Sequence, residues 1–337
     1  MSGTVIIPKQ YLPKLNLLET QVAIKTAKDL FEAQLADAMN LTRVSAPLFV
    51  RPETGLNDDL NGVERPVQFD ILDIGGAQVQ IVQSLAKWKR MALSAYGFAP
   101  GTGLYTDMNA IRRDEELDNL HSVYVDQWDW ELVITGEQRT RQFLREKVTR
   151  LWRAFTKSQE ILCGKFPQLS RFFPSEITFV STQELEDRWP EKTPREREDA
   201  IAKEHGAVFL MGIGGELRSG RPHDGRAPDY DDWALNGDIL VWYPVLDRAV
   251  ELSSMGIRVD AASLERQLAV RGCGERRELP FHKALLEGRL PLTMGGGIGQ
   301  SRICMVLLEK AHIGEVQASI WPQDQLERCA ANGVHLL

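Results

Sequence analysis

Short connections between strands constrain the fold of this chain most strongly. The apolar segments 238–243 and 249–259 are separated only by 244–248, which has room for a turn but not for a helix. Parallel strands need a long crossover, so these two strands are expected to pair antiparallel. The other predicted strands also lie outside the long helical stretches. We therefore predict an α+β fold, an antiparallel β-sheet flanked by helices, with 1–337 forming a single domain.

Long amphipathic segments supply the expected helices. Asn16 and Glu19 have the spacing of a capping box, and the apolar stripe that follows predicts a helix ending near Asn40. A second long helix is expected over 139–163, and the charged segment 184–204 also has a helical pattern. These helices would cover the sheet.

The amino-acid composition limits which binding partners and which cellular location are expected for the chain. The chain has 40 Lys and Arg against 47 Asp and Glu, a net charge of −7, which argues against a nucleic-acid partner. Its four cysteines lack the CxxC spacing of a zinc site and suggest no disulfide framework, so a reducing, cytoplasmic location is expected. No apolar stretch reaches the roughly 18 residues of a membrane span.

A glycine run near the C-terminus predicts a phosphate site. Gly295, Gly296, Gly297 and Gly299 precede Arg302 and an apolar-periodic stretch. Glycines allow close backbone approach, a helix beginning there directs N–H groups at an anion, and the guanidinium adds a charged fork. A glycine-rich turn before a core helix is the alternative. Only 35 residues follow Arg302, too few for the second half of a dinucleotide fold, and no Walker lysine closes the run.

Three segments resemble motifs of the class II aminoacyl-tRNA synthetase catalytic core. In chain order they are Ala46-Pro47-Leu48, the sequence AIRRDE at 110–115, and the glycine run at 295–302. Four longer strings are similar to the ammonia-dependent asparagine synthetases, the aspartate–ammonia ligases. These are SLAKWKR at 84–90, HSVYVDQWDWE at 121–131, RAPDYDDW at 226–233 and ELSSMGIRV at 251–259.

This resemblance covers about residues 8 to 325 and has two departures. The loop between Trp233 and Leu235 is shorter than is usual in the family, and the sequence diverges from about Arg271 to the glycine run. The first departure bears on how the site is covered.

The resemblance implies a reaction and its catalytic arginines. Aspartate and ATP would form β-aspartyl-adenylate and pyrophosphate, and ammonia would then displace AMP to give asparagine. Arg112 would bridge the α-phosphate and the activated carboxylate, a role suited to bidentate guanidinium geometry. Without the resemblance, Arg112 beside Arg113 and Asp114 could equally be a solvated turn. Arg302 would hold the terminal phosphates.

The resemblance also implies the residues that bind aspartate. Asp58 and Asp129 suit the substrate ammonium or the incoming ammonia, and Lys89 and Arg258 suit the α-carboxylate. Ser84, Gln127 and Ser254 complete the aspartate-binding set, and Asp231 is assigned to the nucleotide or ammonia region. Lys89 could instead belong to a basic helix face together with Lys87.

Asp238 and Glu251 are the expected Mg²⁺ ligands by the same resemblance, since Mg²⁺ takes one or two carboxylates plus phosphate oxygens. Hairpin geometry supports this pair independently. A turn centred at Pro244 and Val245 would place the two carboxylates directly opposite each other, with Cβ atoms about 5 Å apart. Like charges there repel unless a cation lies between them. Two exposed acids in another register are the alternative.

Glu251 and Arg258 lie seven positions apart, so an unbroken strand would direct them to opposite faces. If both line the site, Gly256 must mark a bulge or kink.

The nitrogen donor is expected to be free ammonia. A glutaminase site needs a nucleophilic cysteine, but position 2 is Ser2, and Cys163 and Cys304 lie in expected core helices. A homodimer through the first long helix and the segment around Pro47 is implied by the resemblance. A true aminoacyl-tRNA synthetase and a catalytically silent paralogue are the alternatives; the second is disfavoured because the motif arginines and both metal acids are present.

Overall fold

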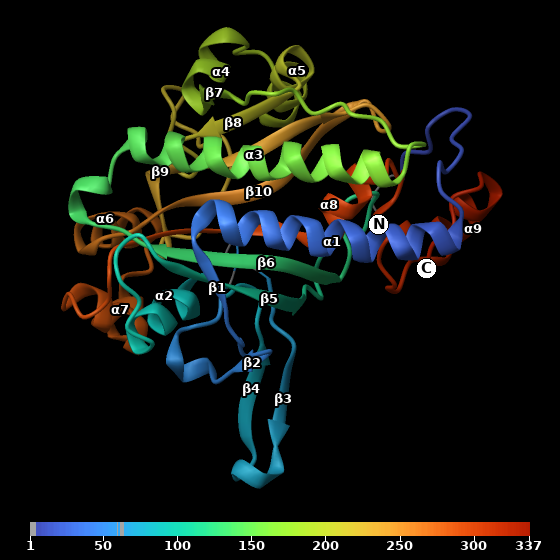
Figure 1. Cartoon of the computed structure of the whole chain (residues 1–337). Coiled ribbons are helices and arrows are strands. Elements are labelled where there is room, and N and C mark those ends of the chain that lie inside the picture. The colour runs from blue at the N-terminus through green and yellow to red at the C-terminus, as the bar shows by residue number, and fades with distance from the viewer. Residues whose placement is uncertain (1–4, 59, 61–63) are drawn as a thin grey trace.

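A mixed eight-stranded sheet forms the central layer of the computed structural model, which describes residues 5–58, 60 and 64–337 (Figure 1). Its strand order is β1-β5-β6-β11-β10-β9-β8-β7. The strands are β1 (Leu41–Arg43), β5 (Gly103–Ile111), β6 (Tyr124–Val133), β7 (Thr178–Ser181), β8 (Ala207–Met211), β9 (Asp231–Tyr243), β10 (Arg248–Arg258) and β11 (Thr293–Gly299).

The prediction of a purely antiparallel sheet is wrong at both edges. Within the sheet, the neighbouring strands of the series β5-β6-β11-β10-β9-β8 pair antiparallel. At the two edges, however, β1 pairs parallel with β5, and β7 pairs parallel with β8. Helices α4 (Thr182–Arg188) and α5 (Pro194–His205) connect β7 to β8, and such a crossover permits parallel pairing. The expected helix over 184–204 is therefore two helices. Pro194 begins the second, at the first helical position that proline favours.

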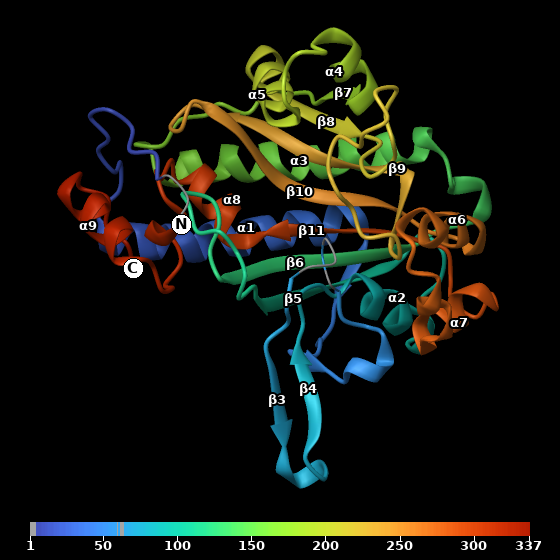
Figure 2. The same ribbon diagram turned by 180° about the vertical axis from the view of Figure 1, so that it is seen from behind.

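Two long helices lie side by side across one face of the sheet (Figure 1). They are α1 (Leu17–Met39) and α3 (Arg141–Lys165). The predicted Asn16–Glu19 capping box is confirmed, and α1 ends at Asn40 in the left-handed conformation. At one end of the sheet lie α2 (Ala86–Ala95), α6 (Ala261–Arg271) and α7 (Pro280–Leu286) (Figure 2). Near the C-terminus are α8 (Gln300–Leu307) and α9 (Gln323–Ala331).

A separate three-stranded sheet projects from the body (Figures 1 and 2). It contains β2 (Phe49–Val50), β3 (Gln68–Ile71) and β4 (Ala77–Ile81) in the order β2-β4-β3. Pro47 precedes its edge strand β2, which is a position that proline tolerates because it cannot donate to a strand ladder. Among the described residues, no helix is long and apolar enough to cross a membrane.

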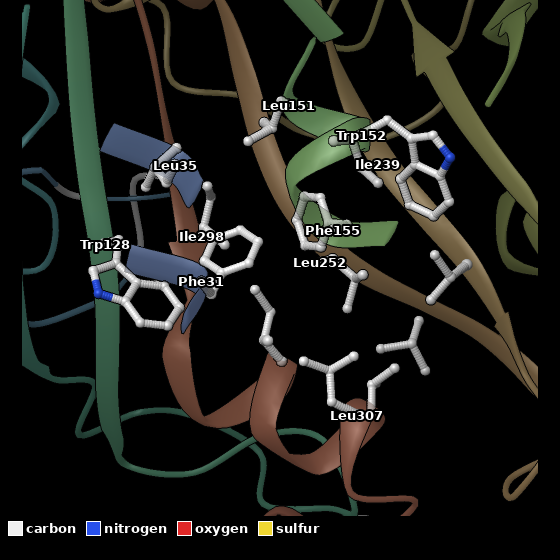
Figure 3. Close-up of a cluster of buried hydrophobic side chains, with 14 of the residues drawn as sticks. Phe31, Leu35, Trp128, Leu151, Trp152, Phe155, Ile239, Leu252, Ile298 and Leu307 are labelled. Atoms are coloured by element: carbon white, nitrogen blue, oxygen red, sulfur yellow. The ribbon is translucent and has the colours of Figure 1, made fainter. Parts of the chain in front are cut away.

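The main hydrophobic core lies between the sheet and the two long helices (Figure 3). Phe31 of α1 packs against Trp128 of β6 and Phe155 of α3, with ring centroids 5.0 and 4.7 Å apart. All three rings are almost completely buried. Because this face of the sheet is apolar, the polar side chains that alternate with it along each strand must point to the opposite face.

Replacing Phe31 by alanine should lower the free energy of unfolding by about 3–5 kcal/mol, because it leaves a cavity among buried aromatic rings. Lys25→Ala on the exposed side of the same helix removes only a surface ion pair and should change stability by less than about 0.5 kcal/mol. Urea denaturation of both variants measures the difference. Equal stabilities would show that α1 does not anchor the core.

Candidate active site

A pocket of about 430 Å³ lies on the face of the sheet opposite the two long helices. Its walls come from β6, β10, β11, the start of α8, the segment that follows β5 and the irregular segment before β9. The predicted site residues that line it are Asp58, Ser84, Arg112, Gln127, Asp129, Asp231, Glu251, Ser254, Arg258, Gly296, Gly297 and Arg302. Lys89, Gly295 and Asp238 lie behind this wall and contact residues that form it.

Strand β6 contributes charged residues by simple alternation. Trp128 and Trp130 face the core, so Gln127, Asp129 and Glu131 face the site. The period-two alternation of β6 thus brings three polar side chains to one face, opposite the two buried tryptophans.

A buried network of charges forms the floor of the pocket. Lys89 of α2 is completely buried, and its Nζ lies 2.6 Å from Asp129 Oδ1 and 3.8 Å from Glu131 Oε2. Arg258 of β10 donates from Nε and Nη2 to the Glu131 carboxylate, at 2.8 to 3.1 Å, and from Nη1 to Asp231 Oδ1 at 2.6 Å. Lys89, rather than Lys87, therefore reaches the floor of the site.

Mutual compensation keeps these buried groups ionised. Burial alone would raise the pKa of Glu131, but Arg258 and Lys89 outweigh it and hold that pKa below its usual value. Burial would lower the pKa of Arg258, yet Glu131 and Asp231 raise it above its ordinary value. Removing one member would leave the others charged, buried and unpaired, which is strongly unfavourable.

The glycine run is the strand β11 rather than a turn, but the expected helix does begin directly after it, at Gln300 of α8. Gly295 and Gly297 pair with Glu131 and Asp129 of β6 on one side and with β10 on the other. Their backbone groups therefore belong to the sheet. At the start of α8 the Ser301 N–H donates to the Asp126 carboxylate at 3.0 Å, so a protein carboxylate already occupies this helix end.

The glycines serve to let side chains meet above β11. A Cβ at Gly295 would overlap the Glu131 carboxylate and lie 2.6 Å from Arg258 Nη2. A Cβ at Gly297 would lie 2.6 Å from Gln127 Oε1. Because β11 has no side chains here, groups on β6 and β10 can touch although a whole strand separates them.

The register of the β9–β10 hairpin differs from the predicted one. Glu251 pairs with Leu240, and Asp238 pairs with Ser254, so the two acids are not directly opposite. They nevertheless share a face, because Leu240 and Asp238 lie two positions apart on β9. The turn between β9 and β10 is centred later in the chain than predicted. One extra residue on β10 then shifts the pairing of Asp238 further.

Two irregularities lie between Glu251 and Arg258, and one of them begins at Gly256, as predicted. The β10 bulge falls between Glu251 and Ser253, at Leu252, and it brings Glu251, Ser254 and Arg258 to one face. A second register shift, between Gly256 and Arg258, has its extra residues on β9. Gly256 allows a close approach, since a Cβ there would lie 2.7 Å from that of Asn236.

Asp238 and Glu251 fit an Mg²⁺ site that substrate phosphates would complete. Arg226 binds one oxygen of Asp238, and the other, Oδ1, is buried without a hydrogen-bond partner among the described residues. Burial and the charge of Glu251 raise the pKa of Asp238 to about 7 against the opposing effect of Arg226. In the described part of the chain no cluster of three or more metal-ligating side chains occurs. Two carboxylates are enough for a metal that phosphate oxygens also hold.

Arg112 and Arg302 lie at the open side of the pocket. Arg112 follows β5, and its Nη1 is 3.8 Å from Glu115. Arg302, in the first turn of α8, donates to the backbone carbonyls of Glu251 and Leu120 at 3.1 and 3.4 Å. Neither guanidinium is held by a close carboxylate among the described residues, so both can receive an anionic ligand.

Three residues that shape the site were not assigned to it from the sequence: Glu131, in the charge network beneath the pocket, and Arg226 and Tyr230, which line it. Glu131 had a signal, because it continues the period-two alternation after Gln127 and Asp129. Arg226 and Tyr230 lie within the family-like string at 226–233, but their position in an irregular segment gives no periodicity from which to assign them. Ser84, which was predicted, caps the start of α2 by accepting the Ala86 N–H at 3.1 Å.

Substituting alanine for Gly295 should destabilise the protein by about 3 kcal/mol or more, because the new methyl group would force Glu131 and Arg258 apart. Gly164→Ala in α3 is the matched control. No atom lies within 4 Å of its added Cβ, so stability should stay the same or rise by up to about 1 kcal/mol. Thermal and urea unfolding of both variants test this, and a stable Gly295→Ala protein would contradict it.

Sequence comparison identifies close relatives. A family model described as aspartate-ammonia ligase matches residues 18–333. An aspartate–ammonia ligase of Ruminiclostridium cellulolyticum is 62% identical over 335 residues, covering 99% of this chain and 100% of the relative. One from Clostridium perfringens is 61% identical over 333 residues, covering 99% of each chain.

Solved structures confirm the synthetase-like fold. Asparaginyl-tRNA synthetase from Entamoeba histolytica superposes with a TM-score of 0.61 at 12% identity, over 89% of this chain and 67% of that one. The Pyrococcus horikoshii asparaginyl-tRNA synthetase in complex with asparaginyl-adenylate gives 0.60 at 15% identity, over 90% and 70%. Such identities show the fold alone, whereas the full-length sequence matches show that the chain belongs to the aspartate–ammonia ligase family.

Proposed function

We propose that this protein converts L-aspartate, ammonia and ATP to asparagine, AMP and pyrophosphate through a β-aspartyl-adenylate. The observation that carries the proposal is the division of the pocket into two ends. Buried, paired charges at the floor suit an amino acid, and two guanidinium groups at the opening, Arg112 and Arg302, suit phosphates. The family match supplies the substrates.

The floor has unused capacity for an amino acid. Asp129 Oδ2 is buried and has no hydrogen-bond partner among the described residues, so it can accept from the substrate ammonium. Arg258 uses Nε, one N–H of Nη1 and one of Nη2 for Glu131 and Asp231, which leaves two N–H groups for the α-carboxylate. Asp58, Ser84, Gln127 and Ser254 line the remaining wall.

Activation of the side-chain carboxylate is a matter of charge neutralisation and positioning. A carboxylate is a poor electrophile, and its adenylate carries a good leaving group. Arg112 would bridge the carboxylate oxygen and the α-phosphate, and Arg302 would hold the terminal phosphates. Asp231, Gly296 and Gly297 also line the pocket, Asp231 beside Arg258. Gly295 acts from behind the wall, by leaving space for Glu131 and Arg258.

Asp238 and Glu251 would hold Mg²⁺, which neutralises phosphate charge when bound. The buried, unpartnered Oδ1 of Asp238 supports this assignment. Arg226 meanwhile fixes the orientation of the Asp238 carboxylate.

Free ammonia is proposed as the nitrogen donor. None of the four cysteines lines the pocket. Burial raises the pKa of Cys304 to about 12 and that of Cys329 to about 11, so neither is a thiolate at neutral pH. Asp58 and Asp129 are the carboxylates that would receive ammonium near the adenylate.

A cytoplasmic homodimer is the proposed form of the enzyme. Exposed apolar side chains on α1, at Leu17, Leu18 and Val22, support an interface there, and Leu48 and Phe49 extend it toward the segment around Pro47. The four free thiols support a reducing environment. Light scattering of the purified protein tests the dimer.

Incubation with aspartate, ATP, Mg²⁺ and ammonium should release AMP and asparagine in equal amounts. Oxygen-18 in the aspartate side-chain carboxylate should appear in AMP, because the adenylate passes one carboxylate oxygen to the phosphate. Chromatography and mass spectrometry measure both products. Formation of ADP, or unlabelled AMP, would rule out the adenylate route.

Arg112→Lys should lower kcat about 10²–10³-fold, because one ammonium cannot reproduce the bidentate contact to a developing charge. Arg113→Lys is the matched control, since Arg113 is exposed and is not among the pocket residues. It should leave kcat unchanged. Steady-state assays with a common thermal-stability check compare the two, and equal activities would remove Arg112 from the mechanism.

A further inference from the structure

The irregular segment 224–230 and the first residue of β9 form one wall of the pocket. Asp224, Gly225, Arg226, Ala227, Tyr230 and Asp231 all line it. Two of these residues form ion pairs with other residues of the site: Arg226 pairs with Asp238, and Asp231 pairs with Arg258. Only Tyr230 and Asp231, at the end of this wall, are held by backbone hydrogen bonding to β10 and the residue after it, so the irregular part of the wall needs another means of holding its position.

Asp229 is fully buried and belongs to an ionic cluster outside the pocket, in which only Arg276 is partly exposed. Its Oδ2 lies 3.2 Å from Lys87 Nζ of α2 and 3.1 Å from Arg276 Nη1 of the 3₁₀ helix Gly274–Glu278. His282 Nε2 of α7 lies 3.0 Å from the same oxygen. We call these four residues the Asp229 hub. Neither Asp229 nor any of its three partners is among the residues that line the pocket.

Electrostatic attraction holds the Asp229 carboxylate, and with it segment 224–230, against the other three residues of the hub. Burial would raise the pKa of Asp229, but Lys87, His282 and Arg276 outweigh it and hold the pKa far below its ordinary value. The carboxylate is thus ionised throughout the neutral range. Charge-assisted hydrogen bonds to three separate elements fix its place in three directions, which an apolar contact would not do.

Hydrogen bonds to backbone carbonyls attach the rest of the segment to the same end of the molecule. Gln267 of α6 donates to the carbonyls of Pro228 and Asp231, both at 2.9 Å. Arg271 donates to the Arg226 carbonyl at 2.9 Å. Trp233 and Leu235 lie within β9, and α6, the following 3₁₀ helix and α7 support segment 224–230 from outside.

We propose that Asp229 is a positioning residue for catalysis: the hub holds segment 224–230 so that Arg226 and Asp231 meet Asp238 and Arg258. Asp231 and Arg258 belong to the end of the pocket assigned to aspartate, so the inference rests on the proposed function. Lys87 and Lys89 then have parallel roles two positions apart on α2. Lys87 positions the wall, and Lys89 pairs with the floor.

Asp229→Asn should raise the KM for aspartate about tenfold, the scale for a group that orients a binding residue through one intermediary. The value of kcat should change much less, because Arg112 and Arg302 lie on other elements. Arg276→Gln, at a partner that is 19% exposed, should raise KM in the same direction by a smaller factor and is less disruptive to folding.

A double variant separates positioning from stability. Lys87→Met added to Asp229→Asn removes one of the unpaired buried cations, so the melting temperature should recover toward wild type while the KM for aspartate stays raised. Arg197→Gln is the destabilising control. Its buried guanidinium bonds the carbonyls of Trp189 and Pro190, outside the pocket, so this variant should melt earlier with a wild-type KM.

All assays are run below the melting temperature of every variant. A wild-type KM in Asp229→Asn and Arg276→Gln, or a KM that recovers together with stability in the double variant, would overturn the positioning role. If Asp229→Asn does not fold, Arg276→Gln alone decides. Failure of the wild-type protein to make asparagine and AMP would instead reject the proposed function, so the two failures are distinguishable.

Discussion

The buried pairing of Glu131 with Arg258 is the interaction on which the pocket depends. It joins β6 to β10 across the glycine strand β11. The two side chains meet in the space that a side chain on β11 would otherwise occupy. Lys89 and Asp231 extend it into a network in which each charge is satisfied only by the others. Such a network is tolerated in a dry interior because the geometry is complete, and it orients the groups proposed to receive an amino acid.

Features governed by local periodicity could be predicted from the sequence. The capping box at Asn16 depends on residues three positions apart, and the alternation that directs Asp129 to the pocket depends only on the pleat of one strand. The class II synthetase-like fold and the aspartate–ammonia ligase family could be recognised because long strings of residues resemble that family. The prediction that twelve distant residues would share one pocket came from this resemblance rather than from periodicity.

Features governed by distant partners could not be predicted. The register of β9 against β10 depends on where the turn is centred and on one extra residue at Leu252. Neither feature can be recognised in the hydrophobic pattern of the sequence. The glycine run has the composition of a phosphate loop, but two flanking strands make it a strand. Lys87 and Asp229 lie 142 positions apart, so their pairing has no local signal. The parallel edge strands likewise depend on long connections.

The lack of side chains on the pocket face of β11 limits how the substrate preference of the enzyme could be redesigned. Strands lie about 4.8 Å apart, so β6 and β10 are separated by roughly twice that distance, and the glycines of β11 add no side chain to the space between them, which Glu131 and Arg258 already fill. Trimming residues cannot deepen the pocket there. An enzyme that accepts a longer amino acid must therefore gain room laterally, by remodelling the segment before β9, and selections aimed at the glycine strand would yield no usable variants.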